Sequence, residues 1–579
     1  MSWADTRPSA PSAAQAPATR QAPWASAAAP ASLHKGQAPI DIAVLTPDDA
    51  WLRRLDTLAW AFVGLGVVLR LGRYLLNFPF WGDELMLVQN YLDRDYADLL
   101  RPLSLEQVAP LGYLAIELTA IKLFGFSEWS LRLFALLSSV AGLFLFRDVA
   151  ARLLGKVPMV LAVGIFAVSY YPIRHAAECK PYGSDLAASM VLVWLAVRWW
   201  QDQANRRWLW ALAVAGPVCL AISNPTVFVA GGVSLALAVP VWQSRDRRTW
   251  LAFAAYNVLM AGAFLLLLRL VTSVQYATTQ KFMLQYWAEG FPPGQPLALL
   301  NWLLSTHAGE MMAYPVGDDR FGSTLTLLCF VAGVTVLFRR KERALVALVL
   351  APLGLALLAA ALRRYPYGGA RLSQYYGSLA CLTVGLGAAS LLGLIARVEA
   401  RRRVFGVTVG VLLAIGGVTL AKDMAQPYKR LVDHEHRGFA RWFWKENAAE
   451  GQVVCLHNDL GRNFFAPRPA EDYLCYQRTC SELHRQGPRA VNLSELPADR
   501  PLRCVTFCLE GEHRDDRAFG RWLAEMATRF SLTGEQTYRV RLNGPREPDR
   551  FGRYMVYEFH ARGAAAETAE HGTAGSAAR

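Results

Sequence analysis

The sequence predicts an α-helical polytopic membrane protein with about eleven spanning helices and a small soluble α/β domain at its C-terminus. Three observations predict this class. Hydrophobic residues fill 54% of the 579 positions and cluster, between Leu55 and Ala421, in runs of about 16 to 24 residues, the length of a membrane-spanning helix. Arg-rich clusters alternate with loops of other composition between these runs. Beyond position 421 the chain becomes polar.

The N-terminal residues 1–50 are rich in Ala, Pro and Ser and contain little that a core could bury, which predicts a disordered cytoplasmic tail. A signal peptide is disfavoured because no apolar core precedes Leu55. The net charge of +14 arises largely from Arg and Lys in short loops between apolar runs. This pattern is typical of a membrane protein, and we expect no nucleic-acid partner.

The charges of the loops indicate on which side of the membrane each loop lies. If the Arg-rich clusters near 146–156, 198–208, 243–249, 339–343 and 396–403 face the cytoplasm, the N-terminus lies inside and the C-terminus outside. These runs form a transmembrane domain over residues 51–421. The predicted spans are 55–77, 131–146, 157–173, 184–200, 207–223, 225–242, 249–271, 322–338, 344–362, 374–396 and 404–421.

The apolar segment from Pro110 to Phe126 is left out of this set. Counting it as a span would place the cluster at 146–156 outside and break the alternation, and the segment also carries Glu117 and Lys122. We therefore expect an interfacial or half-inserted helix on the outer face, within one large outer loop.

Unusual polar residues gather on the predicted outer face. The first outer loop carries Asp83 and Glu84, and Arg132 follows at the mouth of the second span. Arg and Lys are normally scarce in outer loops, so their presence beside acids predicts a bound anion such as a phosphate headgroup. The other candidates for this substrate site are His175, Glu178, Lys180, Tyr182, Lys281, Tyr365, Tyr367 and Arg371.

Each of these features also has an ordinary structural interpretation. An Asp-Glu pair is typical of a solvated turn or a helix N-cap, a lone His such as His175 is commonly structural, and the Arg and Tyr residues near 365 are typical interfacial anchors. The convergence of four loops on one face favours a functional site. The spacing of His and Cys predicts no metal site, and no Gly-rich phosphate loop of the nucleotide-binding type occurs.

Several motifs resemble those of the GT-C membrane glycosyltransferases. "WGDE" at 81–84, followed by "VAPLGYLAIELTAIKLFGFSEWSLRLFA" at 108–135, is similar to the opening of the branch that contains protein O-mannosyltransferases, the lipid A aminoarabinose transferase and Rgt-type transferases. The second element reads Val-Ala-Pro-Leu and lacks the His or Lys usual in that branch. "RHAAECKPYGSD" at 174–185 and "RYPYGGAR" at 364–371 resemble later outer-loop motifs, with Cys179 and Lys180 in place of Ala and Arg. The resemblance covers about residues 55 to 421.

The resemblance implies a GT-C fold and a glycosyltransferase that moves a sugar from a polyprenyl-phosphate carrier to an acceptor hydroxyl on a lipid, a glycan or a protein. By this resemblance Asp83 is the general base and Glu84 supports it, while the outer Arg and Lys residues stabilise the departing phosphate. The resemblance identifies no particular cofactor and leaves a divalent metal compatible with the chemistry. The implied location is the bacterial inner membrane, with the catalytic face and the C-terminal domain outside the cytoplasm.

Residues 422–562 are predicted to form the soluble α/β domain, and 563–579 a disordered tail. Short apolar runs around 452–456 and 503–509 are typical of buried strands, and 516–530 has the spacing of an amphipathic helix. Two other functional classes stay open: a transporter or flippase of lipid-linked sugars, and a non-catalytic membrane scaffold. A transporter would line a path with polar residues inside the helices, whereas here they cluster in outer loops and helix mouths.

Overall fold

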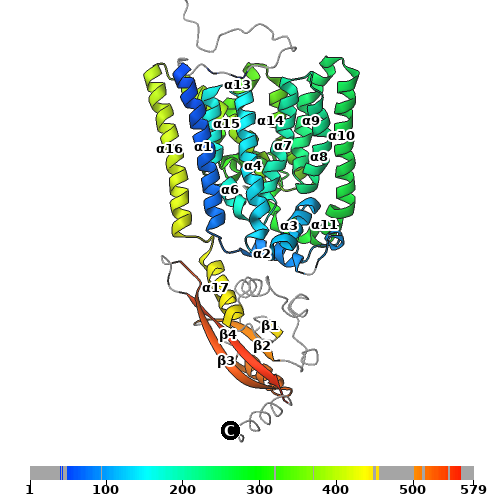
Figure 1. Ribbon diagram of the computed structural model, residues 1–579, viewed down its shortest axis with the longest axis vertical. Coiled ribbons are helices and arrows are strands. Elements are labelled where there is room, and N and C mark those ends of the chain that lie inside the picture. The colour runs from blue at the N-terminus through cyan, green and yellow to red at the C-terminus, as the bar shows by residue number, and fades with distance from the viewer. Residues whose placement is uncertain are drawn as a thin grey trace, which may run out of the picture.

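The computed structural model describes residues 39–562 with gaps at 41, 43–48, 93, 318–320, 370, 447–451, 456–500, 511–515, 545–547 and 549. The two tails predicted as disordered therefore lie almost wholly outside the described residues. Figure 1 shows a long helical bundle and, at one end of it, a smaller unit built on a β-sheet, so the predicted class of polytopic helical protein with a small C-terminal α/β unit is confirmed.

All eleven predicted spans coincide with helices of the bundle. These helices are α1 (Asp49–Leu75), α4 (Ser130–Leu153), α5 (Lys156–Val168) with α6 (Tyr170–Arg174), α7 (Tyr182–Gln201), α8 (Arg207–Ile222), α9 (Thr226–Ser244), α10 (Arg247–Leu267), α13 (Thr324–Arg339), α14 (Arg343–Ala361), α15 (Gln374–Gly393) and α16 (Val398–Ala425).

Within the described residues, length and composition alone identify fewer than eleven candidate membrane spans. Seven helical segments are long and apolar enough to cross a membrane, and α5 with α6, bent by 49°, makes an eighth. α8 and α13 are apolar but shorter, and α7 carries Asp185 and Arg198. The predicted number of eleven spans is therefore reached only when these three helices are counted as well.

Shorter elements lie near the sheet-bearing end of the bundle (Figure 1). α3 has 14 residues, begins after Pro110 and ends at Gly125, whose φ is +81°. At 1.5 Å per residue it is about 21 Å long, too short for a hydrocarbon core of about 30 Å. This length supports leaving the segment out of the spans. The helices at this end are α2 (Gly82–Val88), α3 (Leu111–Phe124), α11 (Ser273–Tyr286) and α12 (Pro296–Ala308).

Single turns connect these helices. Five are 3₁₀ turns: η1 (Gln89–Tyr91), η2 (Ala97–Leu100), η3 (His175–Ala177), η5 (Ala288–Gly290) and η6 (Glu310–Met312). The sixth, η4 (Leu268–Thr272), is a π-helical turn that joins α10 to α11 in one segment of 40 residues.

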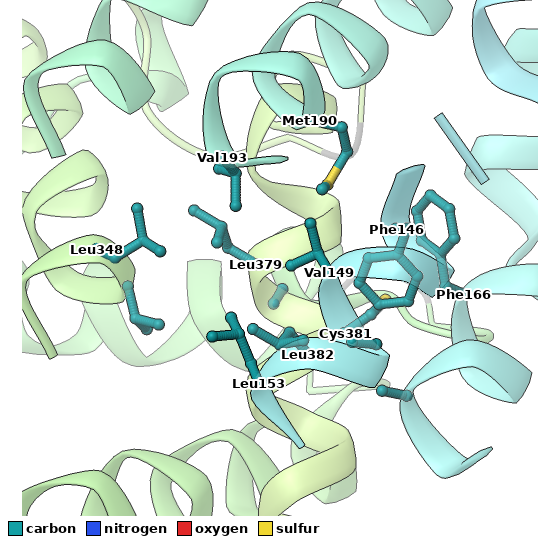
Figure 2. Packing of buried hydrophobic residues seen from close by; sticks show 14 of the residues in the cluster. Phe146, Val149, Leu153, Phe166, Met190, Val193, Leu348, Leu379, Cys381 and Leu382 are labelled. Carbon is teal, nitrogen blue, oxygen red and sulfur yellow. The ribbon is translucent and has the colours of Figure 1, made fainter. Parts of the chain in front are cut away.

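The core of the bundle centres on α15, in which 78% of the most apolar 18-residue stretch is buried. Figure 2 shows its Leu379, Cys381 and Leu382 among side chains of α4, α5, α7 and α14. Two glycines permit the close approach: a Cβ at Gly385 would lie 2.6 Å from Ala162 of α5, and one at Gly387 would lie 1.7 Å from the carbonyl oxygen of Cys329 on α13. Small residues of this kind allow tight helix packing in lipid, where association depends on van der Waals contact.

The C-terminal unit contains a four-stranded sheet in the order β1-β2-β4-β3. β1 pairs parallel to β2, and the other two pairs are antiparallel. The predicted helix at 516–530 is α20, which packs Leu523 and Met526 on Phe530 and Tyr557 of the sheet. The elements are α17 (Leu431–Glu446), β1 (Gln452–Cys455), β2 (Leu502–Leu509), α20 (Asp516–Met526), β3 (Phe530–Arg541) and β4 (Phe551–Ala561).

Helix α17 joins the sheet to the bundle (Figure 1). Its Phe439 stacks on Tyr554 of β4 with ring centroids 3.8 Å apart, and the same buried cluster continues into Phe80, Leu85 and Tyr113 of the 77–130 segment. Ion pairs reinforce this contact, because Glu128 lies 3.0 Å from Arg441 and 3.6 Å from Arg437 of α17. Hydrophobic contacts and ion pairs therefore fix the C-terminal unit against the end of the bundle that carries Asp83.

Candidate active site

Asp83 occupies the second position of α2, directly after the first long helix of the bundle. Its Oδ1 accepts from Lys180 Nζ at 3.0 Å and its Oδ2 from Arg371 Nη1 at 3.2 Å. One quarter of its side chain is exposed, 25% by area. A carboxylate held between two cations from distant parts of the chain, yet open to solvent, has the placement of a reactive group.

Glu84, its neighbour, is buried and differently engaged. Arg132 Nη2 donates to both Glu84 oxygens at 3.0 and 2.9 Å, and Arg132 Nε donates at 3.1 Å. The backbone N–H groups of Cys179 and Trp81 donate to the same carboxylate at 2.7 and 3.2 Å. Burial raises the pKa of Glu84, and the guanidinium opposes that shift. Glu84 thus ties α2, α4 and the 175–181 loop together.

This pairing changes the interpretation of Arg132, which the sequence places in the phosphate site. Its side chain is almost wholly buried, and it also donates to the carbonyl oxygen of Phe78. The geometry favours a positioning role, in which Arg132 and Glu84 hold α2 so that Asp83 faces outward.

Lys180 lies in the loop before α7 and is held on two sides. Besides Asp83, its ammonium donates to Gln107 Oε1 at 2.7 Å. Gln107 directly precedes the Val-Ala-Pro-Leu element, which lacks the basic residue of the GT-C branch it resembles. Lys180 therefore supplies a cation beside that element from a different loop.

Arg371 approaches Asp83 from the loop between α14 and α15. Its Nη2 donates to Tyr286 Oη at 2.9 Å, and its guanidinium lies 4.6 Å from the ring centroid of Trp287. Aromatic rings that face a guanidinium stabilise its charge and fix its plane. Arg371 thus links the ends of three elements, α2, α11 and α15.

Tyr365 and Tyr367, also candidates from the sequence, anchor this loop and do not line the Asp83 group. Tyr365 Oη donates to the carbonyl oxygen of Leu372 at 3.1 Å, and Tyr367 Oη pairs with His307 Nε2 at 3.0 Å. Lys281, a further candidate, is exposed on α11. No contact among the described residues joins it to Asp83.

A second buried group surrounds His175. Its Nδ1 lies 2.7 Å from Glu178 Oε2, while Arg174 Nε donates to the other oxygen at 2.6 Å. Burial opposes ionisation, but Arg174 and His175 lower the pKa of Glu178 well below its usual value. The His175 ring lies 4.8 Å from that of Tyr182, at the start of α7. These contacts shape the loop that presents Lys180.

One further cation, Lys429, was not among the candidates from the sequence and lies in the segment between α16 and α17. Its Nζ lies 3.2 Å from the ring centroid of Trp81, two residues before Asp83. Burial, with Arg174 nearby, lowers the pKa of Lys429 to about 8. Trp81 also faces Arg371 at 5.7 Å and Arg174 at 5.9 Å. Three separate chain segments therefore bring positive charge to one ring.

The residues present do not fit a metal site built on the Asp83-Glu84 pair. Glu84 already accepts from Arg132 and two backbone N–H groups, and Asp83 contacts two cations. Among the described residues no three His, Cys, Asp or Glu side chains gather in a way that could hold an ion.

Comparison with known proteins adds the family. Residues 107–276 match the family model described as dolichyl-phosphate-mannose-protein mannosyltransferase. The resemblance to the GT-C membrane glycosyltransferases is confirmed. The matched segment runs from α3 into α11 and includes the loop with Glu178 and Lys180, whereas Asp83 and Arg371 lie outside it. No curated protein sequence matches the chain.

Solved structures similar to this chain share little sequence with it. ArnT from Cupriavidus metallidurans in the apo state has 13% identity and a TM-score of 0.45, covering 87% of this chain and 98% of its own. The same protein bound to undecaprenyl phosphate has 13% identity, a TM-score of 0.43 and coverages of 88% and 98%. The archaeal oligosaccharyltransferase AglB from Archaeoglobus fulgidus, in complex with an inhibitory peptide and a dolichol-phosphate, has 11% identity, a TM-score of 0.41 and coverages of 73% and 64%.

Proposed function

We propose that this protein transfers a sugar from a polyprenyl-phosphate carrier to an acceptor hydroxyl, with Asp83 as the general base. The single observation that carries the proposal is the open Asp83 carboxylate between Lys180 and Arg371, at the end of a membrane bundle. The family match supports the donor class, since the relatives it describes use a polyprenol-linked sugar, dolichyl-phosphate-mannose. The acceptor is a lipid, a glycan or a protein.

In the proposed reaction, residues of this chain supply the base and the cations. Asp83 accepts the proton of the acceptor hydroxyl as that oxygen bonds to the anomeric carbon. The bond from this carbon to the carrier phosphate breaks, and the phosphate leaves with the bonding electron pair. Lys180 and Arg371 then stabilise the added negative charge.

Contacts already present leave capacity for this chemistry. An ammonium has three donors, and Lys180 uses two, toward Asp83 and Gln107. A guanidinium has five N–H groups, and Arg371 uses one each toward Asp83 and Tyr286. Each Asp83 oxygen has a second lone pair for an acceptor hydroxyl. Both cations are thus able to bind phosphate without releasing Asp83.

An apolar surface beside the site suits the prenyl chain. Phe282 of α11 is exposed, and its ring lies 5.5 Å from that of Tyr286, the partner of Arg371. Leu297 and Leu300 of α12 are exposed as well. A carrier whose phosphate lies at Arg371 would place its first isoprene units over these side chains, which gain from contact with hydrocarbon.

The decisive test is sugar release from a labelled polyprenyl-phosphate sugar by purified protein. Asp83→Asn keeps the shape of the side chain and removes the base, so turnover should fall by about 10²–10⁴-fold while carrier binding persists. Asp95→Asn is the matched control, because Asp95 is an exposed carboxylate of the same outer segment that pairs with Lys122 at 2.6 Å. Near-full activity of Asp83→Asn would overturn the assignment.

The roles of Lys180 and Arg371 are tested by measuring the KM for the lipid-linked donor. Arg371→Lys and Lys180→Met should each raise the KM for the lipid-linked donor by about tenfold or more, because Lys cannot reproduce a bidentate phosphate contact and Met has no charge. Lys281→Met, which removes an exposed charge of α11, serves as control. If both variants matched the parent at every donor concentration, the phosphate would bind elsewhere.

The same release assay separates the two other functional classes, since neither a transporter nor a scaffold releases sugar from its carrier. The transferase is favoured because Asp83, Lys180 and Arg371 meet at one end of the bundle, whereas a transport path would need charged groups along the helices. Arg70, fully buried in α1, donates to Ser139 and to the carbonyl oxygens of Gly66 and Ala167, and these contacts tie α1 to α4 and α5.

We extend the proposal to orientation: the Asp83 end of the bundle and the C-terminal unit face outward across a bacterial inner membrane. The support is the alternation of Arg-rich loops, which collect at the opposite end.

A further inference from the structure

A pocket of about 540 Å³ lies between the starts of α8 and α10. These helices begin at the end of the bundle away from α17 (Figure 1). Its wall contains Asn205, Arg206, Arg207 and Trp210 from the α8 side, and Arg248 and Leu251 from α10. Neither the Asp83 site nor the family match accounts for it. We call it the α8–α10 pocket.

The α8–α10 pocket carries excess positive charge. Arg206 donates to Asp246 at 2.6 Å, and Asp246 also caps α10 by accepting from the backbone of Arg248 and Thr249. Among the described residues the guanidinium groups of Arg207 and Arg248 form no hydrogen bond or ion pair, and both side chains are exposed. Three arginines and one aspartate leave a net charge of 3 − 1 = +2.

The remaining wall is apolar and faces outward. Trp210 is 44% exposed and Leu251 61% exposed, although both belong to helices that pack within the bundle. Next to them Trp250 and Trp242 pair with ring centroids 4.7 Å apart, and both are exposed. Exposed Trp at a helix end is typical of the level where headgroups meet hydrocarbon. The pocket thus borders the acyl region on one side and water on the other.

We infer that the α8–α10 pocket binds the phosphate headgroup of an anionic phospholipid. Arg207 and Arg248 contact the phosphate oxygens, for which the guanidinium fork is suited, and the acyl chains run along Trp210 and Leu251. The net charge of +2 repels the ammonium of a zwitterionic headgroup. Basic pockets between helices recognise anionic headgroups by the same physics. A free phosphate or a soluble phosphate ester gains nothing from the apolar wall.

The experiment measures lipid retention by the purified full-length protein in detergent, using native mass spectrometry with added phosphatidylglycerol or phosphatidylcholine. The parent should retain phosphatidylglycerol in preference. At about 1 kcal/mol per Arg, loss of both charges in Arg207→Gln with Arg248→Gln should weaken retention about 30-fold, and either single variant about 5-fold. Melting temperatures, recorded in parallel, establish that each variant is folded, and the single variants carry the test if the double variant is not.

The control is Arg245→Gln with Arg247→Gln, which removes the same amount of charge next to Arg248, at positions that do not line the pocket. It should retain the lipid nearly as the parent does. Equal loss in this control, or equal retention of phosphatidylcholine by the parent, would reduce the effect to general surface charge and overturn the proposal. Displacement of the lipid by millimolar inorganic phosphate or glycerol phosphate would overturn it too, because the ligand would then be a soluble anion.

Discussion

Replacing Arg132 with Lys distinguishes a positioning role from a contact with the donor phosphate. Arg132 makes three hydrogen bonds to Glu84 and one to the Phe78 carbonyl oxygen, all in a buried site. A lysine ammonium is a compact point charge that keeps one of the bonds to Glu84. Losing two charge-assisted bonds to Glu84 at about 1.5–3 kcal/mol each predicts a loss of about 3–6 kcal/mol in stability.

The assay for Arg132→Lys combines two readouts on protein purified in detergent: thermal unfolding followed by size-exclusion chromatography, and KM for the lipid-linked donor. Unfolding should occur at a lower temperature, and the KM of the surviving folded fraction should stay near the parent value. Glu84→Gln should behave alike, since it leaves the guanidinium buried without its charge partner.

A double-mutant cycle sharpens this prediction. Glu84→Gln combined with Arg132→Gln removes both charges, so its cost should be smaller than the sum of the two single costs. If Arg132→Lys left stability unchanged and raised the donor KM tenfold, the positioning role would be refuted and Arg132 would belong to the phosphate site.

Three other predictions address the surroundings of the site. Because burial lowers the pKa of Lys429 from its usual 10.5 to about 8, the folded chain binds fewer protons than the unfolded chain between these values. The free energy of unfolding should therefore rise with pH across this window, and Lys429→Met should abolish the rise in a pH series of unfolding measurements. Glu128→Gln breaks the ion pairs that Glu128 makes with α17, so limited proteolysis should cleave the chain between the bundle and Arg441 faster than in the parent. An unchanged cleavage rate would show that the apolar cluster alone fixes the C-terminal unit against the bundle. A reporter active only outside should work when fused at Ser127 or after Ala421, and silence at Ser127 would make α3 a span.

The bundle was predictable because its signals are local. Each span is a continuous apolar run, and the Arg-rich clusters mark one end of most of them. α3 shows the same logic: its apolar composition suggested a span, the charge alternation argued against it, and its length of 14 residues supports leaving it out. The locations of β3 and β4 were less apparent, since strand patterns in a small domain depend on pairing partners far along the chain.

The site was only partly predictable. Asp83, Lys180 and Arg371 were all candidates, and the structure brings them together. The Glu84–Arg132 pair was missed because it joins residues 48 positions apart, although an acid and an arginine beside apolar runs are a usable signal for burial as a pair. Lys429 lies in a polar stretch with no motif, so only the fold places it on Trp81.

The contact of Lys429 with Trp81 has a consequence for biosynthesis. Trp81 and Asp83 leave the ribosome just after the first helix of the bundle, α1, whereas Lys429 follows the last helix, α16. At about 5–20 residues per second, the roughly 350 residues between them take about 20 to 70 s to translate. Throughout that interval the inserted chain lacks one of the cations that enclose Trp81. The charge environment of the site is therefore completed by a late-made segment, after every helix of the bundle has been synthesised.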